Sequence, residues 1–323
     1  MKRMHSVLLA FLAVLVAGGA SDVFGQKKPL DHDVYDDWKS IRGETLSDDG
    51  RWALFEIVPA DGQGELRVRS VNSDVEHVFP RGKTARFTAD SRFAVFLIAP
   101  ERAAVEAAKE AKKKAHEMPK DSLGILDLST GDVVKVEHVR SFRVPGEGSG
   151  WLAYLLDAEA PGSGATEKKD GEAEEVAAEE VSEALAERRK KKTEGTTLVL
   201  RDLRTGAERS FEHVVDYRFS ENGALLAYTA SSKDGSADGV YAVALSKGDV
   251  VAVMTGEGEY KQLAVDAKGG QVAFLSNRDD FAAEQAAFTL YHWRSGERSA
   301  RAAAREWTAW IPAWGWGREH GSL

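Results

Sequence analysis

The chain has 323 residues, of which 43% are hydrophobic, and a formal net charge of -9. This length and apolar content predict a globular protein with a buried core, built as one large domain or two ordinary ones. The charge is spread over acidic and basic runs and leaves no basic face for nucleic acid, and the absence of cysteine excludes a disulfide framework.

The first 25 residues are typical of a secretory signal peptide. A positively charged start precedes a short apolar core at 7–16, and small residues follow. An apolar run of about ten residues is too short to span a bilayer, which needs roughly 20. An uncleaved anchor or a buried strand is the alternative. We predict cleavage after Ala20 or Gly25, a periplasmic or secreted protein, and no membrane span once the signal is removed.

A polar lead-in segment, residues 26–46, follows the signal. It contains two aromatic residues three positions apart, Tyr35 and Trp38. We expect these rings to pack on the first structural repeat, and a tryptophan that stacks on a ligand is the alternative.

A pattern that begins at residue 47 recurs four more times. Each copy is a polar tight turn, with Gly, Asp or Asn able to adopt a positive φ, followed by an apolar strand that ends on an aromatic ring. The copies are 47–55 (SDDGRWALF), 88–96 (TADSRFAVF), 147–154 (EGSGWLAY), 220–228 (SENGALLAY) and 266–274 (DAKGGQVAF). Recurrence of this kind predicts a repeat architecture.

The closing aromatic residues set the period of this repeat. They are separated by 41, 58, 74 and 46 residues and are Phe55, Phe96, Tyr154, Tyr228 and Phe274. The two long intervals contain low-complexity insertions at 101–118 and 161–194, and both intervals shorten to 40 residues without them. A strand-rich period of about 40 to 46 residues matches a four-stranded propeller blade.

Each interval also contains a hairpin whose polar turn usually ends in glycine. The segments are 66–74 (LRVRSVNSD), 124–131 (GILDLSTG), 198–206 (LVLRDLRTG), 240–248 (VYAVALSKG) and 290–296 (LYHWRSG). This is what the middle hairpin of a blade requires. The sequence therefore predicts an all-β fold, a β-propeller of about five four-stranded blades over residues 47–323 that forms an incomplete ring.

Three segments depart from the repeat. Residues 101–118 consist mainly of Ala, Glu and Lys and predict a solvated helical arm. Residues 161–194 pass from an acidic block to a basic run at 188–192 and predict disorder or a marginal surface helix, with a gating or recruiting arm as the alternative. The Trp-rich segment 307–323 is expected to fill space between blades or against a partner domain, and a stacking platform for sugars or bases is the alternative.

Several strings resemble secreted bacterial members of the prolyl oligopeptidase family. They are 34–41 (VYDDWKSI), 46–52 (LSDDGRW), 107–114 (AAKEAKKK), 118–125 (MPKDSLGI), 195–203 (GTTLVLRDL), 231–235 (SSKDG), 238–242 (DGVYA) and 275–280 (LSNRDD). In that family an N-terminal β-propeller caps a C-terminal α/β-hydrolase domain with a Ser, Asp, His triad, and the propeller admits only short peptides. The resemblance implies the substrate-gating part of an exported serine peptidase whose peptide substrate is cleaved by a hydrolase domain missing from this chain.

The residues themselves predict no catalytic group, cofactor or metal site. The G-x-S-x-G elbow of such hydrolases is absent, and the Gly-Ser-Gly strings at 148–150 and 162–164 have the wrong flanks and are expected to be turns or linkers. His292 lies in a predicted strand and is expected to be structural. The acidic pairs at 48–49 and 279–280 offer too few oxygen ligands for calcium and are expected to form turns.

Two functions from different classes follow. The chain is either a propeller fragment of a peptidase with no activity of its own, or a stand-alone periplasmic propeller that binds or scaffolds a partner. An enzyme with its site on the propeller axis is a third possibility. Peptide specificity, total blade number and oligomeric state stay open at this stage.

Overall fold

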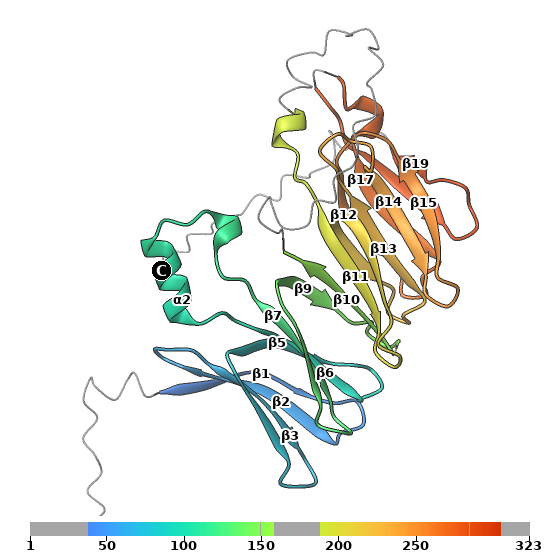
Figure 1. Cartoon of the computed structure of the whole chain (residues 1–323). Coiled ribbons are helices and arrows are strands. Elements are labelled where there is room, and N and C mark those ends of the chain that lie inside the picture. The colour runs from blue at the N-terminus through green and yellow to red at the C-terminus, as the bar shows by residue number, and fades with distance from the viewer. Residues whose placement is uncertain (1–37, 149, 158–187, 284, 305–323) are drawn as a thin grey trace, which may run out of the picture. The chain divides into compact units, whose positions relative to one another are not determined.

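The computed structural model describes residues 38–148, 150–157, 188–283 and 285–304 (Figure 1). The predicted signal peptide, most of the second insertion and the Trp-rich segment 307–323 lie outside the described residues. The chain divides into two compact units, residues 1–38 and 39–323, and every described strand belongs to the second. Within the described residues, no helix has the length and apolar character needed to cross a membrane.

The described strands form five successive blades of four antiparallel strands each, which confirms the predicted β-propeller fold (Figure 1). Blade 1 consists of β1 (Lys39–Leu46), β2 (Trp52–Pro59), β3 (Glu65–Ser70) and β4 (Glu76–Pro80). Blade 2 consists of β5 (Gly82–Phe87), β6 (Phe93–Ile98), β7 (Ser122–Asp127) and β8 (Val133–Val136).

Blades 3 and 4 share one long strand and therefore form a single seven-stranded sheet. Blade 3 consists of β9 (Val139–Arg143), β10 (Trp151–Leu156), β11 (Thr196–Asp202) and the first half of β12 (Glu208–Phe219). Blade 4 consists of the second half of β12, β13 (Leu225–Ala230), β14 (Gly239–Ala244) and β15 (Asp249–Thr255). Blade 5 consists of β16 (Tyr260–Val265), β17 (Gln271–Ser276), β18 (Thr289–Arg294) and β19 (Arg301–Ala304).

Strand β1 lies within the segment predicted as a lead-in, residues 26–46, so blade 1 begins at Lys39 and not at Ser47. The repeated pattern marks the turn into the second strand of a blade, and the first strand precedes it. That first strand is mostly polar, is exposed throughout and carries a bulge around Gly43, so it lacks the apolar alternation by which a strand is usually recognised. Trp38 is half exposed, and Tyr35 lies outside the described residues.

The repeated turns between first and second strands, which we call the corners, are closed by one side-chain network. In blade 1 the Ser47 hydroxyl donates to Asp49 Oδ1 over 2.7 Å and accepts the Trp52 N–H over 3.0 Å. Asp49 Oδ1 also accepts the Arg51 N–H over 3.0 Å. Gly50 has a φ of +68°, which lets the chain reverse within this network.

The same network recurs at other corners. Thr88 Oγ1 accepts the Phe93 N–H and Ser220 Oγ accepts the Leu225 N–H, each over 3.0 Å. At blade 5 the carboxylate of Asp266 takes the place of the hydroxyl and accepts the Gln271 N–H over 2.7 Å. Because these serine and threonine side chains are buried, the network satisfies backbone groups that water cannot reach.

Adjacent corners are also hydrogen-bonded to each other. The Asp49 N–H donates to Ser91 Oγ over 3.1 Å, which joins blades 1 and 2. Asn222 Nδ2 donates to the Lys268 carbonyl over 3.1 Å, which joins blades 4 and 5. At the corner of blade 3, a Cβ atom on Gly148 would lie 2.4 Å from the Asn222 carbonyl oxygen, so only glycine fits there. The corners therefore set the contact between blades.

The hydrophobic core consists of four buried clusters, one at each interface between consecutive blades. Alternate residues of a central strand point to opposite faces of the blade and pack against the two neighbouring blades. In β6, Phe93 and Val95 pack toward blade 3, whereas Ala94 and Phe96 pack toward blade 1. Strands buried on both faces must be apolar at consecutive positions, which is why the sequence shows continuous apolar runs at these strands.

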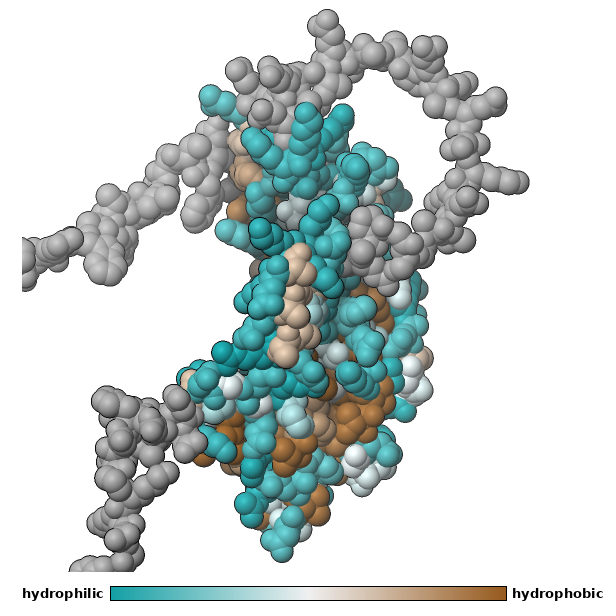
Figure 2. Space-filling view, turned by 60° about the vertical axis from the view of Figure 1, so that its left-hand side comes forward, coloured by the Kyte–Doolittle hydropathy of each residue, from teal (hydrophilic) through white to brown (hydrophobic). Residues whose placement is uncertain are grey.

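The two end blades differ from the three inner ones. Strands β6, β10 and β13 are buried along most of their length, whereas β17 alternates and β2 has Leu54 as its one buried residue. Among the described residues, no buried cluster joins blade 5 to blade 1. The view in Figure 2 is mainly hydrophilic, with apolar side chains gathered toward its lower part. On β1, Ile41 is 64% and Leu46 62% exposed.

Residues 26–323 alone are expected to be oligomeric or poorly soluble, because each end blade leaves one sheet face without a neighbouring blade. Light scattering measures this, and the variant Ile41→Lys/Leu46→Lys on exposed β1 is expected to raise the monomer fraction. A parent chain that is monomeric and melts in one cooperative step would show instead that the end blades close on each other.

Ser220→Ala is expected to lower the free energy of unfolding by about 1–3 kcal/mol, because it removes the acceptor of the buried Leu225 N–H. Denaturant unfolding measures the change. The control is Ser40→Ala, whose exposed hydroxyl donates to the Val58 carbonyl over 3.3 Å and should contribute little. Equal effects of the two substitutions would show that the corner network does not stabilise the fold.

Candidate functional site

The insertions lie at one end of the blades, which we call the loop end. They all occur between the second and third strands of a blade, and in an antiparallel meander these loops lie at the opposite end of the blade from the corners. The loop end carries α2 (Arg102–Glu110) and η2 (Ala115–Glu117) in blade 2, the helical turn 188–191 before the third strand of blade 3, and η3 (Arg278–Asp280) in blade 5 (Figure 1).

Helix α2 confirms the helical arm predicted for residues 101–118. Its residues are exposed apart from Ala108, which is buried, and Val105, which is partly buried. Arg102 donates to Asp61 Oδ1 over 2.7 Å and to Glu106 Oε1 over 2.8 Å, so the start of the helix is attached to the loop of blade 1. The arm is therefore held at its first turn.

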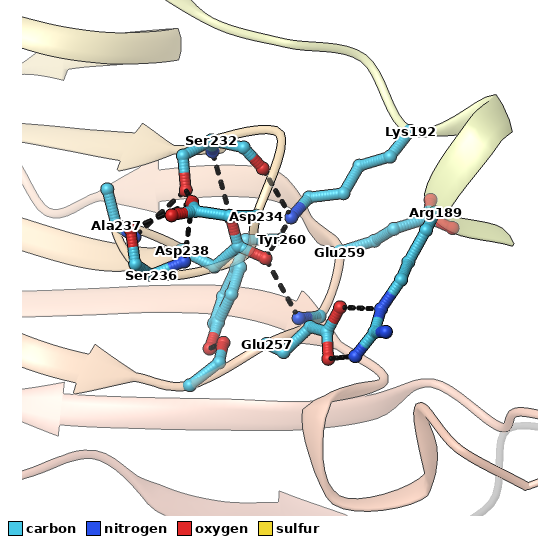
Figure 3. Close-up of polar contacts among 12 residues, drawn as sticks. Arg189, Lys192, Ser232, Asp234, Ser236, Ala237, Asp238, Glu257, Glu259 and Tyr260 are labelled. Carbon is cyan, nitrogen blue, oxygen red and sulfur yellow. Dashed lines mark hydrogen bonds and ion pairs between the residues drawn. The ribbon is translucent and has the colours of Figure 1, made fainter. Parts of the chain in front are cut away.

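The basic run that ends the second insertion is fixed to blades 4 and 5 (Figure 3). Residues 188–191 form a helical turn. Arg188 donates to the Phe281 carbonyl over 2.7 Å, and Arg189 forms two hydrogen bonds with Glu257, of 2.6 and 2.7 Å. These hydrogen bonds hold the pKa of the Glu257 carboxyl below its ordinary value.

Lys192 continues this attachment through a buried ion pair with Asp238. The two side chains are 4% and 0% exposed, and Lys192 Nζ also donates to the Ser232 carbonyl over 2.9 Å. Asp238 Oδ1 accepts the Ser232 N–H over 3.0 Å and Oδ2 accepts the Gly258 N–H over 3.1 Å. A buried pair with its remaining hydrogen bonds satisfied in this way holds one geometry.

The helical turn at residues 188–191 agrees with the marginal surface helix that was one of the two predicted forms, but its attachment to blades 4 and 5 was not predicted. The run has no apolar periodicity, and its partners Asp238 and Glu257 lie 46 and 68 residues along the chain from Lys192 and Arg189. Pairings at that separation leave no mark in the local pattern. The acidic part of the insertion lies outside the described residues.

The loop of blade 4 beside Lys192 is ordered by its own side chains (Figure 3). Ser232 Oγ donates to Asp234 Oδ1 over 2.7 Å, and the Ser236 N–H donates to the same atom over 3.1 Å. These contacts lower the pKa of Asp234, the hydrogen bond from Ser232 most of all. Tyr260 donates to the Gly256 carbonyl over 2.8 Å, and burial raises the pKa of its hydroxyl.

This cluster is suited to holding a loop and an insertion in place. A cavity of about 110 Å³ next to it is lined by Lys192, Tyr260 and Lys261, among others. The Lys192 ammonium is occupied by Asp238 and the Ser232 carbonyl, so it is not a free base or nucleophile. We therefore assign the Lys192–Asp238 pair an anchoring role.

The residues considered from sequence are placed as follows. His292 lies on β18, with Nε2 2.8 Å from Gln271 Oε1. Asp49 closes the corner of blade 1, and Asp279 accepts hydrogen bonds from Arg278 and Tyr291. Residues 149 and 162–164 lie outside the described residues. Across the part of the chain that is described, no group of three or more His, Asp or Glu side chains is arranged to hold a metal ion.

Comparison with known proteins gives structural likeness alone. No family model matches the sequence, and no curated protein does. The similar solved structures include the β-propeller domain of the trilobed protease from Pyrococcus furiosus, with 10% identity, a TM-score of 0.42, and coverage of 82% of this chain and 72% of that one. The acylaminoacyl peptidase of Pyrococcus horikoshii has 10% identity and a TM-score of 0.42, over 84% of this chain and 41% of that one.

An oligogalacturonate lyase in complex with manganese is similar to the same degree, with 16% identity, a TM-score of 0.43, and coverage of 84% of this chain and 67% of that one. The chain spans about two fifths of the acylaminoacyl peptidase. These structures differ in function, and one fold hosts many activities. The fold is therefore assigned from the blade topology above, and the function below is argued from this chain's own residues.

Lys192→Met is expected to lower the free energy of unfolding by about 3–5 kcal/mol, because it leaves the buried Asp238 carboxylate without its counter-ion. Thermal and denaturant melts measure the loss. Lys190→Met, on the exposed side of the same helical turn, is the matched control and should change stability by less than about 0.5 kcal/mol. Similar melts for both variants would refute the anchoring role.

Proposed function

We propose that this chain is the substrate-gating propeller of an exported serine peptidase of the prolyl oligopeptidase family, which acts on short peptides through a hydrolase domain outside this chain. The observation that carries the proposal is where the family-like strings lie. Residues 231–235 lie in the loop that contains Asp238, residues 238–242 run from that loop into β14, and residues 275–280 run from β17 into η3. The first two strings contact the anchored basic run through Ser232 and Asp238, and the third ends one residue before Phe281, whose carbonyl accepts a hydrogen bond from Arg188.

The loop end has the properties that a contact surface for a second domain needs. Loops on a rigid scaffold carry function, and here the loops are fixed by buried polar contacts such as those of Asp238 and Asn277. The second insertion also leaves and rejoins the blades at this end. A peptidase that admits only short substrates requires ordered loops of this kind around its entrance.

The place of action that we propose is the periplasm or the exterior of the cell. Support comes from the charged start and apolar core within residues 1–25. The alternative function is a stand-alone periplasmic propeller that binds or scaffolds a partner, since the same blades would serve it.

The deciding experiment is isolation of the native polypeptide from its cells with antibodies against residues 39–304. We expect it to be longer than 323 residues, to react with a fluorophosphonate probe, and to cleave short peptides until that probe is added. The recombinant 323-residue chain should cleave none. A native polypeptide that ends at Leu323 and does not react with the probe would favour the binding module. Inhibitor-sensitive hydrolysis by the 323-residue chain would refute the proposal that the catalytic domain lies outside this chain.

A further inference from the structure

A second polar site lies on the first strands of blades 2, 3 and 4. A cavity of about 390 Å³ is lined by residues of β5, β9 and the second half of β12, together with residues 144–146 that follow β9. Three of the lining side chains are arginines, Arg86, Arg143 and Arg218. The segments 142–146 and 218–221 run into the corners, so this cavity lies toward the opposite end of the blades from the Lys192–Asp238 pair.

The positive charge of the cavity is only partly neutralised. Asp216 is shared by two arginines, with its Oδ1 3.7 Å from Arg143 Nη2 and its Oδ2 3.9 Å from Arg218 Nε. Both distances exceed hydrogen-bonding range, so these guanidinium groups keep their donors. Glu221 lines the cavity and Asp216 lies beside two of its arginines, so three cations have two carboxylates near them.

Arg86 differs from the other two arginines. Its side chain is exposed, and among the described residues its guanidinium has no ion pair or hydrogen bond. Arg67 in blade 1, by contrast, reaches the carboxylates of Glu65 and Glu76. Arg86 thus presents a complete set of donors to the cavity.

The remaining walls of the cavity are largely apolar. Phe142, Phe219 and Val144 line it, and all three are partly buried. The Arg143 guanidinium lies over the Tyr217 ring, 5.4 Å from its centre, and this contact fixes its direction. Planar guanidinium groups pair with carboxylates through two parallel hydrogen bonds, and apolar walls favour a ligand that carries hydrocarbon beside its charge.

We propose that this cavity binds a carboxylate-bearing peptide, with Arg86 and Arg218 as the principal donors and Arg143 as the oriented third. Its volume is within the range of ligand pockets and suits one or two amino-acid residues. The carboxylate comes either from an acidic side chain or from a free C-terminus. The site belongs to the propeller itself and does not require the peptidase function proposed above.

Calorimetric titration of the purified chain separates these sources. The probes are the acetylated tripeptides Ala-Phe-Glu amide, which carries only a side-chain carboxylate, Ala-Phe-Gln acid, which carries only a terminal one, and Ala-Phe-Gln amide, which carries none. We expect at least one acidic peptide to bind and the neutral peptide not to. Arg86→Gln and Arg218→Gln should each weaken binding about tenfold, the loss of one charge-assisted hydrogen-bonded contact.

The matched control is Arg140→Gln. Arg140 is an exposed arginine on β9, the strand that also carries Arg143, but it does not line the cavity. Its substitution should leave the dissociation constant unchanged. Arg86→Lys and Arg218→Lys keep the positive charge but lose the guanidinium that can make two parallel hydrogen bonds to a carboxylate. These variants should keep the melting temperature of the parent chain and bind the acidic peptides more weakly.

Four results would overturn the proposal: no binding of either acidic peptide, equal binding of the neutral peptide, tighter binding of inorganic phosphate than of both acidic peptides, or equal weakening by Arg140→Gln and Arg86→Gln. The outcome is independent of the peptidase question. If the native polypeptide does not react with the fluorophosphonate probe, the peptidase proposal is refuted and the proposal for this cavity stands. If neither acidic peptide binds in the titration, the proposal for this cavity is refuted and the peptidase proposal stands.

Discussion

In blades 1, 2, 4 and 5 a backbone N–H at the start of the second strand donates a hydrogen bond to a side-chain oxygen at the corner, and the rest of the structure depends on this contact. It fixes the angle between first and second strands at Ser47, Thr88, Ser220 and Asp266. Because neighbouring corners are also bonded to each other, the same turns set how one blade lies against the next. Only with that angle fixed do the central strands bury both faces, and only then does a polar cavity of defined shape exist on the inner strands.

Most of the architecture could be predicted from the sequence, because the corner and the following strand are local. Serine, threonine or aspartate, then Asp or Asn, then a residue able to adopt positive φ, leave a pattern that recurs near a constant spacing. The first strands could not be found in this way, since β1 is exposed and bulged. The helical arm was recognisable from composition, whereas the order of residues 188–192 depends on partners far along the chain.

The polar groups of both candidate sites depend on partners that lie far apart along the chain. Lys192 and Asp238 form a buried ion pair that anchors an insertion, and no pattern in the sequence predicted this contact. The three arginines of the cavity on the first strands come from blades 2, 3 and 4 and have only two carboxylates near them. They converge only once the blades are assembled. Sequence reasoning found the architecture that brings them together but not the arginines themselves, because single arginines on polar strands are common.

Strand β12 has a consequence for how this protein comes apart. It supplies the last strand of blade 3 and the first of blade 4 without leaving the sheet, with one register shift against β11 between Phe211 and Val214 and another against β13 between Val214 and Asp216. Other neighbouring blades meet through side chains, corner contacts and isolated backbone hydrogen bonds such as that from Ala300 to Val253, but blades 3 and 4 belong to one hydrogen-bonded sheet. They must therefore open together, and the amide protons slowest to exchange with solvent will be those of β10 to β14.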